Sequence, residues 1–162
     1  MRRNHGGFSL VELLIVVSVI LIIAAIAIPN FLRSRIAANQ ASAIQSMRQI
    51  TTAEVSYSTT FGPGFSPTLP ALGPPPTGQG PTSTAAGLLD QILASGSKSG
   101  YTFSYTPTNP DPTTGQPYGY TVNADPAVPG QTGGVFYYVD QSGVIRANST
   151  TDAASTDSAV GD

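Results

Sequence analysis

The sequence contains no cysteine and no tryptophan, and its only histidine is His5. Without cysteine, no disulfide can hold the fold together. Without a cysteine or a second histidine, the chain also lacks the ligands of the usual zinc sites and the base of a histidine-dependent nucleophilic triad. It has no nucleophile elbow and no phosphate-binding glycine loop. These absences argue against an enzyme and predict no metal and no cofactor.

Charged residues are also scarce. They make up 10% of the 162 residues, whereas average domains contain about 25%. Acidic residues outnumber basic ones by nine to seven, for a formal net charge of −2. A nucleic-acid-binding domain would carry a basic surplus, so no nucleic acid is expected as a partner. The 17 glycines and 14 prolines instead predict a neutral surface that is rich in turns.

One long apolar run lies near the amino terminus. Residues 8–28 are apolar except for Ser9, Glu12 and Ser18. In a helix this run measures roughly 32 Å at about 1.5 Å per residue, enough to cross a hydrocarbon core of about 30 Å. A carboxylate inside such a run is costly and marks a functional position, for which a cationic partner is expected.

The run begins Gly-Phe-Ser-Leu-Val-Glu-Leu-Leu-Ile-Val-Val and ends Ala-Ile-Ala-Ile-Pro-Asn-Phe, after a short basic leader. This pattern resembles the amino-terminal signature of type IV pilins and of type II secretion pseudopilins. In that family a prepilin peptidase cuts after the glycine and methylates the new terminal amine. The resemblance, close over residues 6–35, implies cleavage between Gly7 and Phe8, an N-methylated Phe8 and an assembly role for Glu12.

The spacing of Phe8 and Glu12 gives this role a physical basis. A terminal ammonium at Phe8 and the Glu12 carboxylate would lie on one helix face, one turn apart. Pairing within one subunit, or between staggered neighbours, would neutralise two costly charges and set the register of the chains. The alternative is that Glu12 lies at the level of the lipid headgroups, in contact with water, and has no specific role.

Two other targeting signals share some of these features. Residues 25–27, Ala-Ile-Ala, fit a signal-peptidase site that would leave Ile28 as the first residue. Glu12 and the length of the apolar run argue against that interpretation. Arg2 and Arg3 begin like a twin-arginine signal but lack the rest of the pattern. They are better explained as the positive flank that keeps the amino terminus in the cytoplasm.

The helical pattern continues beyond the apolar run. Residues 31–61 contain no further proline or glycine, so we expect one long helix over about residues 8–60, interrupted at Pro29. A proline inside a helix removes a backbone hydrogen bond at a cost of about 3 kcal/mol. Pro29 therefore predicts a kink at the membrane surface. The resemblance implies a further role for it, as a point that loosens on assembly.

The exported half of this helix, residues 29–61, carries an apolar stripe at helical spacing, which predicts that a sheet packs against it. The stripe comprises Ile36, Ala43, Met47, Ile50, Tyr57 and Phe61. Glu54 falls on the same stripe and would need a partner if buried. Lys98 is the candidate partner.

The rest of the chain divides by composition. Residues 62–100 form a connection rich in Pro and Gly, with a short helix expected at 85–96 after the candidate N-cap Thr84. Residues 101–147 alternate in polarity and predict three or four antiparallel strands, at 101–105, 118–122, 135–139 and 144–147. Residues 148–162 form a Ser/Thr/Ala/Asp tail that is expected to be flexible. Residues 1–7 are the leader.

Three aspartates invite comparison with calcium-binding loops. Asp111, Asp125 and Asp140 lie in turn-rich segments, but none has the regular ligand spacing of an EF-hand. Aspartate is also common at the first position of turns, which accounts for all three.

Together these patterns predict a pilin-like α+β fold, in which one long helix, membrane-spanning over residues 8–28, packs on a small antiparallel sheet. The expected function is that of a pilin, the structural subunit of a type IV pilus. The alternatives are a pseudopilin and, in another class, a membrane-anchored or secreted binding module. The resemblance implies copies of the chain itself, prepilin peptidase, an inner-membrane platform and a motor ATPase as partners. It also implies insertion in the lipid of the bacterial inner membrane before export to a pilus or a periplasmic pseudopilus.

Overall fold

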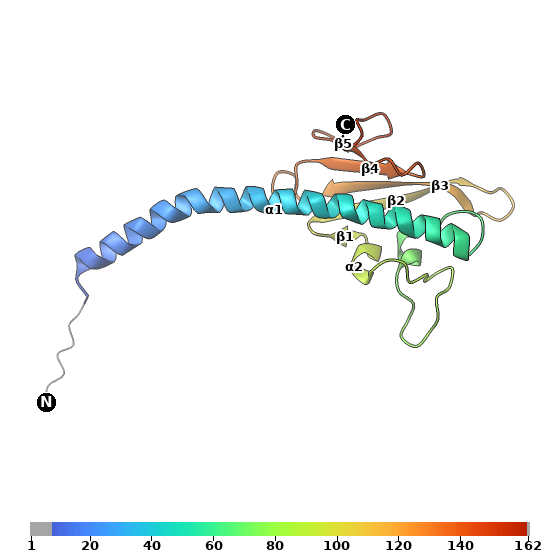
Figure 1. Cartoon of the computed structure of the whole chain (residues 1–162), viewed down its shortest axis with the longest axis horizontal. Helices are drawn as coiled ribbons and strands as arrows, with labels where there is room; N and C mark the ends of the chain where they lie inside the picture. The colour runs from blue at the N-terminus through green and yellow to red at the C-terminus, as the bar shows by residue number, and fades with distance from the viewer. Residues whose placement is uncertain (1–7, 162) are drawn as a thin grey trace. The chain divides into compact units, whose positions relative to one another are not determined.

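The computed structural model describes residues 8–161 (Figure 1). The predicted leader with Gly7, and the last residue, lie outside the described residues. The chain divides into two compact units, Met1–Arg35 and Ile36–Asp162. The elements, in chain order, are helix α1 (Leu10–Thr60), 3₁₀ helix η1 (Leu69–Leu72), helix α2 (Gln91–Ala94) and strands β1 (Ser97–Lys98), β2 (Tyr101–Pro110), β3 (Pro117–Pro126), β4 (Phe136–Asp140) and β5 (Arg146–Asn148).

The first unit contains the amino-terminal part of α1. This helix is long and apolar enough to cross a membrane. We expected an interruption at Pro29, but the residues on both sides of Pro29 are helical. The prediction of an interrupted helix is therefore wrong for this structure. A helix can keep its path through a proline at the expense of one backbone hydrogen bond.

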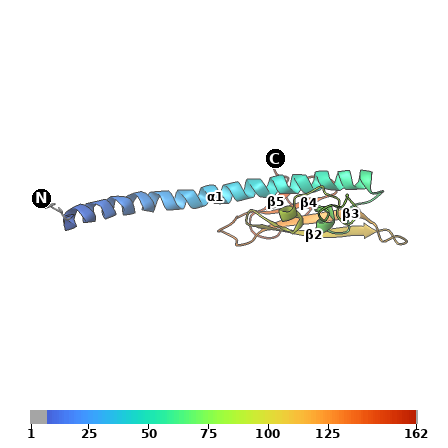
Figure 2. The ribbon, with the colours of Figure 1, turned by 90° about the horizontal axis from the view of Figure 1, so that it is seen from below.

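The second unit contains the remainder of α1 and a five-stranded antiparallel sheet in the order β1-β2-β3-β4-β5. Figures 1 and 2 show the second half of α1 lying across one face of this sheet. This arrangement confirms the predicted α+β layout. The sheet has one strand more than the three or four expected, because β1 pairs only two residues with β2 and is too short to show in the sequence.

The core lies between α1 and the sheet. Ala43, Met47, Ile50 and Tyr57 of the predicted stripe are buried. Ile36 and Phe61 are only partly buried, because they lie at the two ends of the stripe. The sheet contributes buried side chains that alternate along its strands, as the period of two requires: Tyr101, Phe103, Tyr120, Val122, Ala124, Tyr137 and Val139.

Strand β2 carries prolines because part of it is an edge. Beyond Phe103, whose amide donates to the Gly96 carbonyl (2.8 Å), no further residue of β1 covers it. Alternate amides of a strand face the same side, so position 107 would also direct its N–H to this open edge. Pro107 has no N–H to offer there. The proline is thus tolerated in β2, and it removes a donor from the edge.

Helix α2 is shorter than predicted. We expected a helix over residues 85–96 with Thr84 as the N-cap, but only Gln91–Ala94 is helical and Asp90 is the N-cap. The amides of Ala86 and Leu88 instead donate to carbonyls at residues 71 and 72, at 2.8 and 2.9 Å. These residues are held in an extended pairing with the segment of η1, so they are not free to form a helical turn.

The carboxy-terminal segment also differs from expectation. We expected a flexible tail from residue 148, but this segment lies along the outer edge of β5. The amide of Ala147 donates to the Ser158 carbonyl (3.0 Å), and the amide of Val160 donates to the Ile145 carbonyl (2.8 Å). Ala153 is buried. A low-complexity composition favours disorder, but here backbone pairing to β5 orders the segment.

Candidate functional site

The amino-terminal end of α1 is formed by Ser9 and Glu12. Ser9 precedes the first helical residue, and its carbonyl accepts from the amide of Leu13 (3.2 Å). The Glu12 carboxylate accepts from the backbone amide of Ser9 (2.8 Å). This is the reciprocal half of a capping box, which the spacing Ser-x-x-Glu signals in the sequence and which our sequence reasoning missed. Glu12 therefore also has a local role in starting the helix.

The apolar side chains around Glu12 have no cover within the chain. Every large apolar residue from Phe8 to Leu32 is exposed, and Phe8 itself is 85% exposed. An apolar surface of this extent is stable in lipid or against other apolar helices, but not in water. The first unit is thus built to be covered by a membrane or by partner helices, and Phe8 and Glu12 lie at its start.

Glu54 is the buried acidic residue of the second unit. Its side chain is fully buried, at 0% exposure, on the apolar stripe of α1. Its carboxylate accepts from both the backbone amide (2.9 Å) and the hydroxyl of Ser66. The prediction that Lys98 pairs with Glu54 is wrong, because the Lys98 ammonium pairs with Asp90 (2.8 Å). The tertiary fold, rather than the charge pattern, determines which donor reaches Glu54.

Ser66 in turn connects Glu54 to the sheet. The hydroxyl of Tyr105 on β2 donates to the Ser66 carbonyl (2.8 Å). The Tyr105 ring stacks on Tyr120 of β3, with ring centres 5.8 Å apart. The ring of Phe65 meets Tyr120 edge-on at 4.9 Å. This group, which we call the Glu54 network, fixes the start of the proline-rich connection to both α1 and the sheet, in a chain that has no disulfide.

Burial also changes the ionisation of the Glu54 network. Burial raises the pKa of Glu54, although the hydrogen bonds from Ser66 act in the opposite direction. Burial, and to a lesser extent the negative charge of Glu54, raises the pKa of the Tyr105 hydroxyl. A carboxyl group with a raised pKa marks a functional-site candidate when it lies in a cleft. Glu54 is fully enclosed, which indicates a structural role.

The three aspartates considered as calcium ligands lie in different settings. Asp111 accepts from the amides of Thr113 and Thr114, both at 2.8 Å, and Asp140 accepts from the amide of Ser142 (2.9 Å). These are turn contacts. Asp125 instead lies within β3, so the turn explanation is wrong for it, and one of its carboxylate oxygens has no hydrogen-bond partner in residues 8–161. Over this same range, no three His, Cys, Asp or Glu side chains come together as a metal site.

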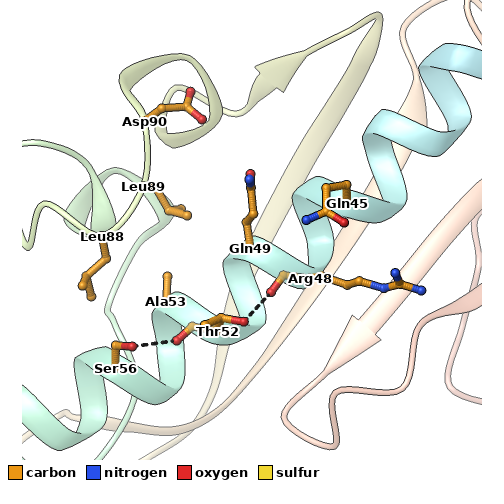
Figure 3. A pocket seen from close by; sticks show the side chains of 9 residues that line it. All are labelled: Gln45, Arg48, Gln49, Thr52, Ala53, Ser56, Leu88, Leu89 and Asp90. Atoms are coloured by element: carbon orange, nitrogen blue, oxygen red, sulfur yellow. Dashed lines mark hydrogen bonds between the residues drawn. The ribbon is translucent and has the colours of Figure 1, made fainter.

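A groove of about 460 Å³ lies between α1 and the segment that precedes α2 (Figure 3). Its helical side presents polar residues together with Ala53, and its other side is formed by Leu88, Leu89 and Asp90. The hydroxyls of Thr52 and Ser56 donate to helix carbonyls at 2.9 and 3.0 Å. The side chains of Gln45, Arg48 and Gln49 complete the helical side. The sequence places Gln45 and Arg48 on the polar face of the helix, suited to solvent or to neighbouring subunits, but it does not reveal the groove.

Comparison with known proteins gives matches to parts of the chain. The family model described as the prokaryotic N-terminal methylation motif matches residues 2–28. The type IV major pilin protein PilA of Myxococcus xanthus is 46% identical over 55 residues, which cover 34% of this chain and 24% of that protein. The type IV wide pilus major component PilA4 of Thermus thermophilus is 57% identical over 37 residues, which cover 23% of this chain and 28% of that protein.

These matches cover only part of the chain. The chain spans about a quarter of the length of each of these two relatives. No solved structure matches the chain. The motif match includes Phe8, which lies just before α1, and Glu12 in the first turn of α1.

Proposed function

We propose that the chain is a pilin of the type IV pilin and pseudopilin family, which its amino-terminal methylation motif and its similarity to two pilus proteins support. In this proposal prepilin peptidase cuts between Gly7 and Phe8 and methylates Phe8. Before assembly, the mature chain is inserted in the inner membrane with its amino terminus on the cytoplasmic side. It then polymerises through α1 into a type IV pilus, with the sheet on the outside. A membrane platform and a motor ATPase would drive this step.

One observation carries the proposal: an acidic side chain lies one turn from Phe8 on a helix whose large apolar side chains are all exposed up to Leu32. Such a helix needs apolar neighbours, and Glu12 needs a cation when the neighbours exclude water. The terminal ammonium that cleavage creates at Phe8 supplies this cation in the same chain or in an adjacent one. The apolar surface then provides the binding energy of the fibre, and the charge pair sets its register.

The two relatives favour a pilus over a pseudopilus, because both are described as pilus components. Long surface fibres that contain this chain would support the pilin assignment. Short periplasmic assemblies without surface fibres would favour the pseudopilin alternative.

The proposal is tested first by the intact mass and amino-terminal sequence of the protein isolated from its native envelope. We expect a chain that begins with N-methylated Phe8. A chain that begins at Ile28 would show conventional secretion, and a chain that retains Met1 would show that no cleavage occurs. Either result would remove the ammonium that the assembly role of Glu12 requires.

The assembly role is tested by Glu12→Gln, scored by electron microscopy of fibres sheared from cells. We expect membrane insertion to persist and fibres to be lost, because the amide has no charge to pair with the terminal amine. Ser18→Ala is the matched control within the same apolar run, since the Ser18 hydroxyl donates only to Leu14 and Ile15 of its own helix. Normal fibres from Glu12→Gln would refute the pairing role.

We also propose that Pro29 marks the point where α1 loosens during assembly. A proline leaves one carbonyl of the preceding turn without its helical donor, so opening the helix there costs less than elsewhere. In assembled fibres we expect amide hydrogen exchange around Pro29 to be faster in the wild type than in Pro29→Ala. Equal protection in the two proteins would argue for a simple structural role.

A further inference from the structure

The groove of Figure 3 contains an unpartnered cation. Arg48 is exposed, and its side chain lies at the rim of the groove on the side away from Asp90. Asp90 cannot neutralise it, because one Asp90 carboxylate oxygen accepts from the Leu93 amide (2.9 Å) and the other from Lys98 (2.8 Å). The nearest candidate counter-ion in the groove is thus already occupied.

Arg48 differs in this respect from the other basic residues of the second unit. Lys98 pairs with Asp90, and the Arg146 guanidinium donates to the Asp157 carbonyl (2.7 Å). Within residues 36–161, Arg48 is the basic side chain with no recorded hydrogen bond or ion pair. The side-chain amides of Gln45 and Gln49, beside it on α1, are likewise exposed and form no hydrogen bond within residues 36–161.

The net charge of the same unit indicates what kind of molecule would pair with Arg48. Residues 36–161 contain three basic side chains and seven acidic ones. Copies of this unit therefore repel one another, except where the free cation of one meets a carboxylate of another. Asp152, for example, is exposed in the carboxy-terminal segment. A contact that places Arg48 of one copy beside a carboxylate of another would relieve part of this repulsion.

We propose that the groove binds a carboxylate-bearing segment of a second copy of this chain. The inference rests on the proposed function, because a filament brings copies side by side. The guanidinium would hold the carboxylate through paired N–H donors, and the amides of Gln45 and Gln49 would bind the backbone of the incoming segment. Ala53, Leu88 and Leu89 in the lining of the groove would provide its apolar contacts.

The charged, polar and apolar side chains of the groove together are typical of a site that binds a protein. Protein interfaces combine an arginine anchor, apolar contacts and a polar rim. A single exposed ion pair contributes little, about 0.2–1 kcal/mol, but a filament repeats the contact at every subunit. The effect on assembly is therefore larger than the effect on one pair of chains.

The first test compares two full-length variants with the same change in net charge. Arg48→Gln removes one positive charge at the groove, and Gln131→Glu adds one negative charge at an exposed loop position outside it. We expect Arg48→Gln to lower the fraction of chains recovered in sheared fibres by about fivefold, and Arg48→Lys to restore most of it. We expect Gln131→Glu to assemble like the wild type. Equal fibre yields from Arg48→Gln and the wild type would overturn the proposal.

The second test uses the absence of cysteine. Gln49→Cys gives the full chain a single thiol in the groove, which can carry a maleimide-linked photo-crosslinker. We expect irradiated fibres to yield dimers of this chain, with the crosslink mapped by mass spectrometry to a segment that contains an aspartate. A crosslink to another protein, to a glycan or to no partner at all would refute the second-copy assignment.

The same experiments separate this inference from the function on which it rests. If Arg48→Gln forms as many fibres as the wild type and Glu12→Gln forms none, only the groove proposal is overturned. The absence of fibres from the wild type would overturn the pilin proposal and the groove proposal together.

Discussion

The Glu54 carboxylate and Ser66 are joined by two hydrogen bonds, one from the backbone amide and one from the hydroxyl of Ser66. Twelve residues separate them in the chain, and both are fully buried. This contact fastens the end of α1 to the connection that follows it. It places a carboxylate in an apolar core, where it remains satisfied only while Ser66 stays in position.

Replacing Glu54 with alanine should therefore destabilise the second unit. The amide of Ser66 would be left buried without an acceptor, at a cost of about 2 kcal/mol. The hydroxyl of Ser66 would keep its bond to the Thr68 carbonyl (3.2 Å). The measurement is urea unfolding of the full chain in detergent micelles, followed by the near-ultraviolet circular dichroism of the tyrosines. Glu12→Ala is the matched control, since Glu12 lies outside this unit. A shift of less than about 1 kcal/mol for Glu54→Ala would contradict the role of the contact.

Stability should also depend on pH through Glu54. Burial raises the pKa of Glu54 in the folded state above the ordinary glutamate value of about 4.3, so folding favours the protonated form. The free energy of unfolding of the wild type, relative to Glu54→Gln, should be highest at acidic pH. It should fall as the pH rises through the raised pKa.

The comparison with Glu54→Gln isolates this effect from the other carboxyl groups, because both proteins share them. Glutamine keeps an acceptor for Ser66 but does not ionise. A difference in unfolding free energy that stays constant between acidic and neutral pH would contradict a raised pKa at Glu54. A difference that grows with rising pH in favour of the wild type would contradict it as well.

Two adjacent glycines offer a test of packing beside Tyr101. A Cβ at Gly133 would overlap the hydroxyl and ring of Tyr101, whereas a Cβ at Gly134 would find its nearest neighbour, Gln40, at 3.9 Å. Tyr101 is fully buried and donates to the Val135 carbonyl (2.9 Å), so it cannot move aside freely. Gly133→Ala should lower the unfolding free energy by about 2 kcal/mol, and Gly134→Ala should leave it nearly unchanged. Equal effects of the two changes would show that the space around Tyr101 is not limiting.

The carboxy-terminal segment should be released from β5 by Asp157→Ala. The Asp157 carboxylate accepts from the side chain of Asn148 (3.1 Å) and from the amide of Ala154 (2.7 Å). Without these bonds, the amides of Ala147 and Val160 should exchange hydrogen faster, which mass spectrometry of the full chain can measure. Ser155→Ala, at an exposed position, should not change their exchange. Unchanged protection in Asp157→Ala would show that backbone pairing alone holds the segment.

Much of the fold could be predicted from the sequence because it depends on periodicity. The apolar run, the buried stripe of Ala43, Met47 and Ile50, and the alternating strands each follow from a repeat that one chain segment carries by itself. The sequence placed Glu54 on the buried face for the same reason. These features need no knowledge of what the segment packs against.

The features that were missed depend on contacts between distant segments. Ser66 rather than Lys98 reaches Glu54 because the proline-rich connection folds back on α1. Residues 86–88 pair with the segment of η1, which prevents the helix expected there. The carboxy-terminal segment is ordered by β5. In each case a backbone group decides the outcome, and backbone groups are the same for every residue type, so composition does not predict the pairing.

Neither edge of the sheet presents a long unbroken row of free backbone groups. On one side β1 covers the start of β2 and Pro107 lacks an N–H farther along it, and on the other side the carboxy-terminal segment pairs with β5. An open edge is a template on which a strand from another molecule can add, and such additions lead to irreversible aggregation. Where many copies crowd together, as a filament requires, this risk is greatest. The interrupted edges favour side chains over strands as the means by which neighbouring copies recognise each other, so the subunits can crowd together without merging their sheets.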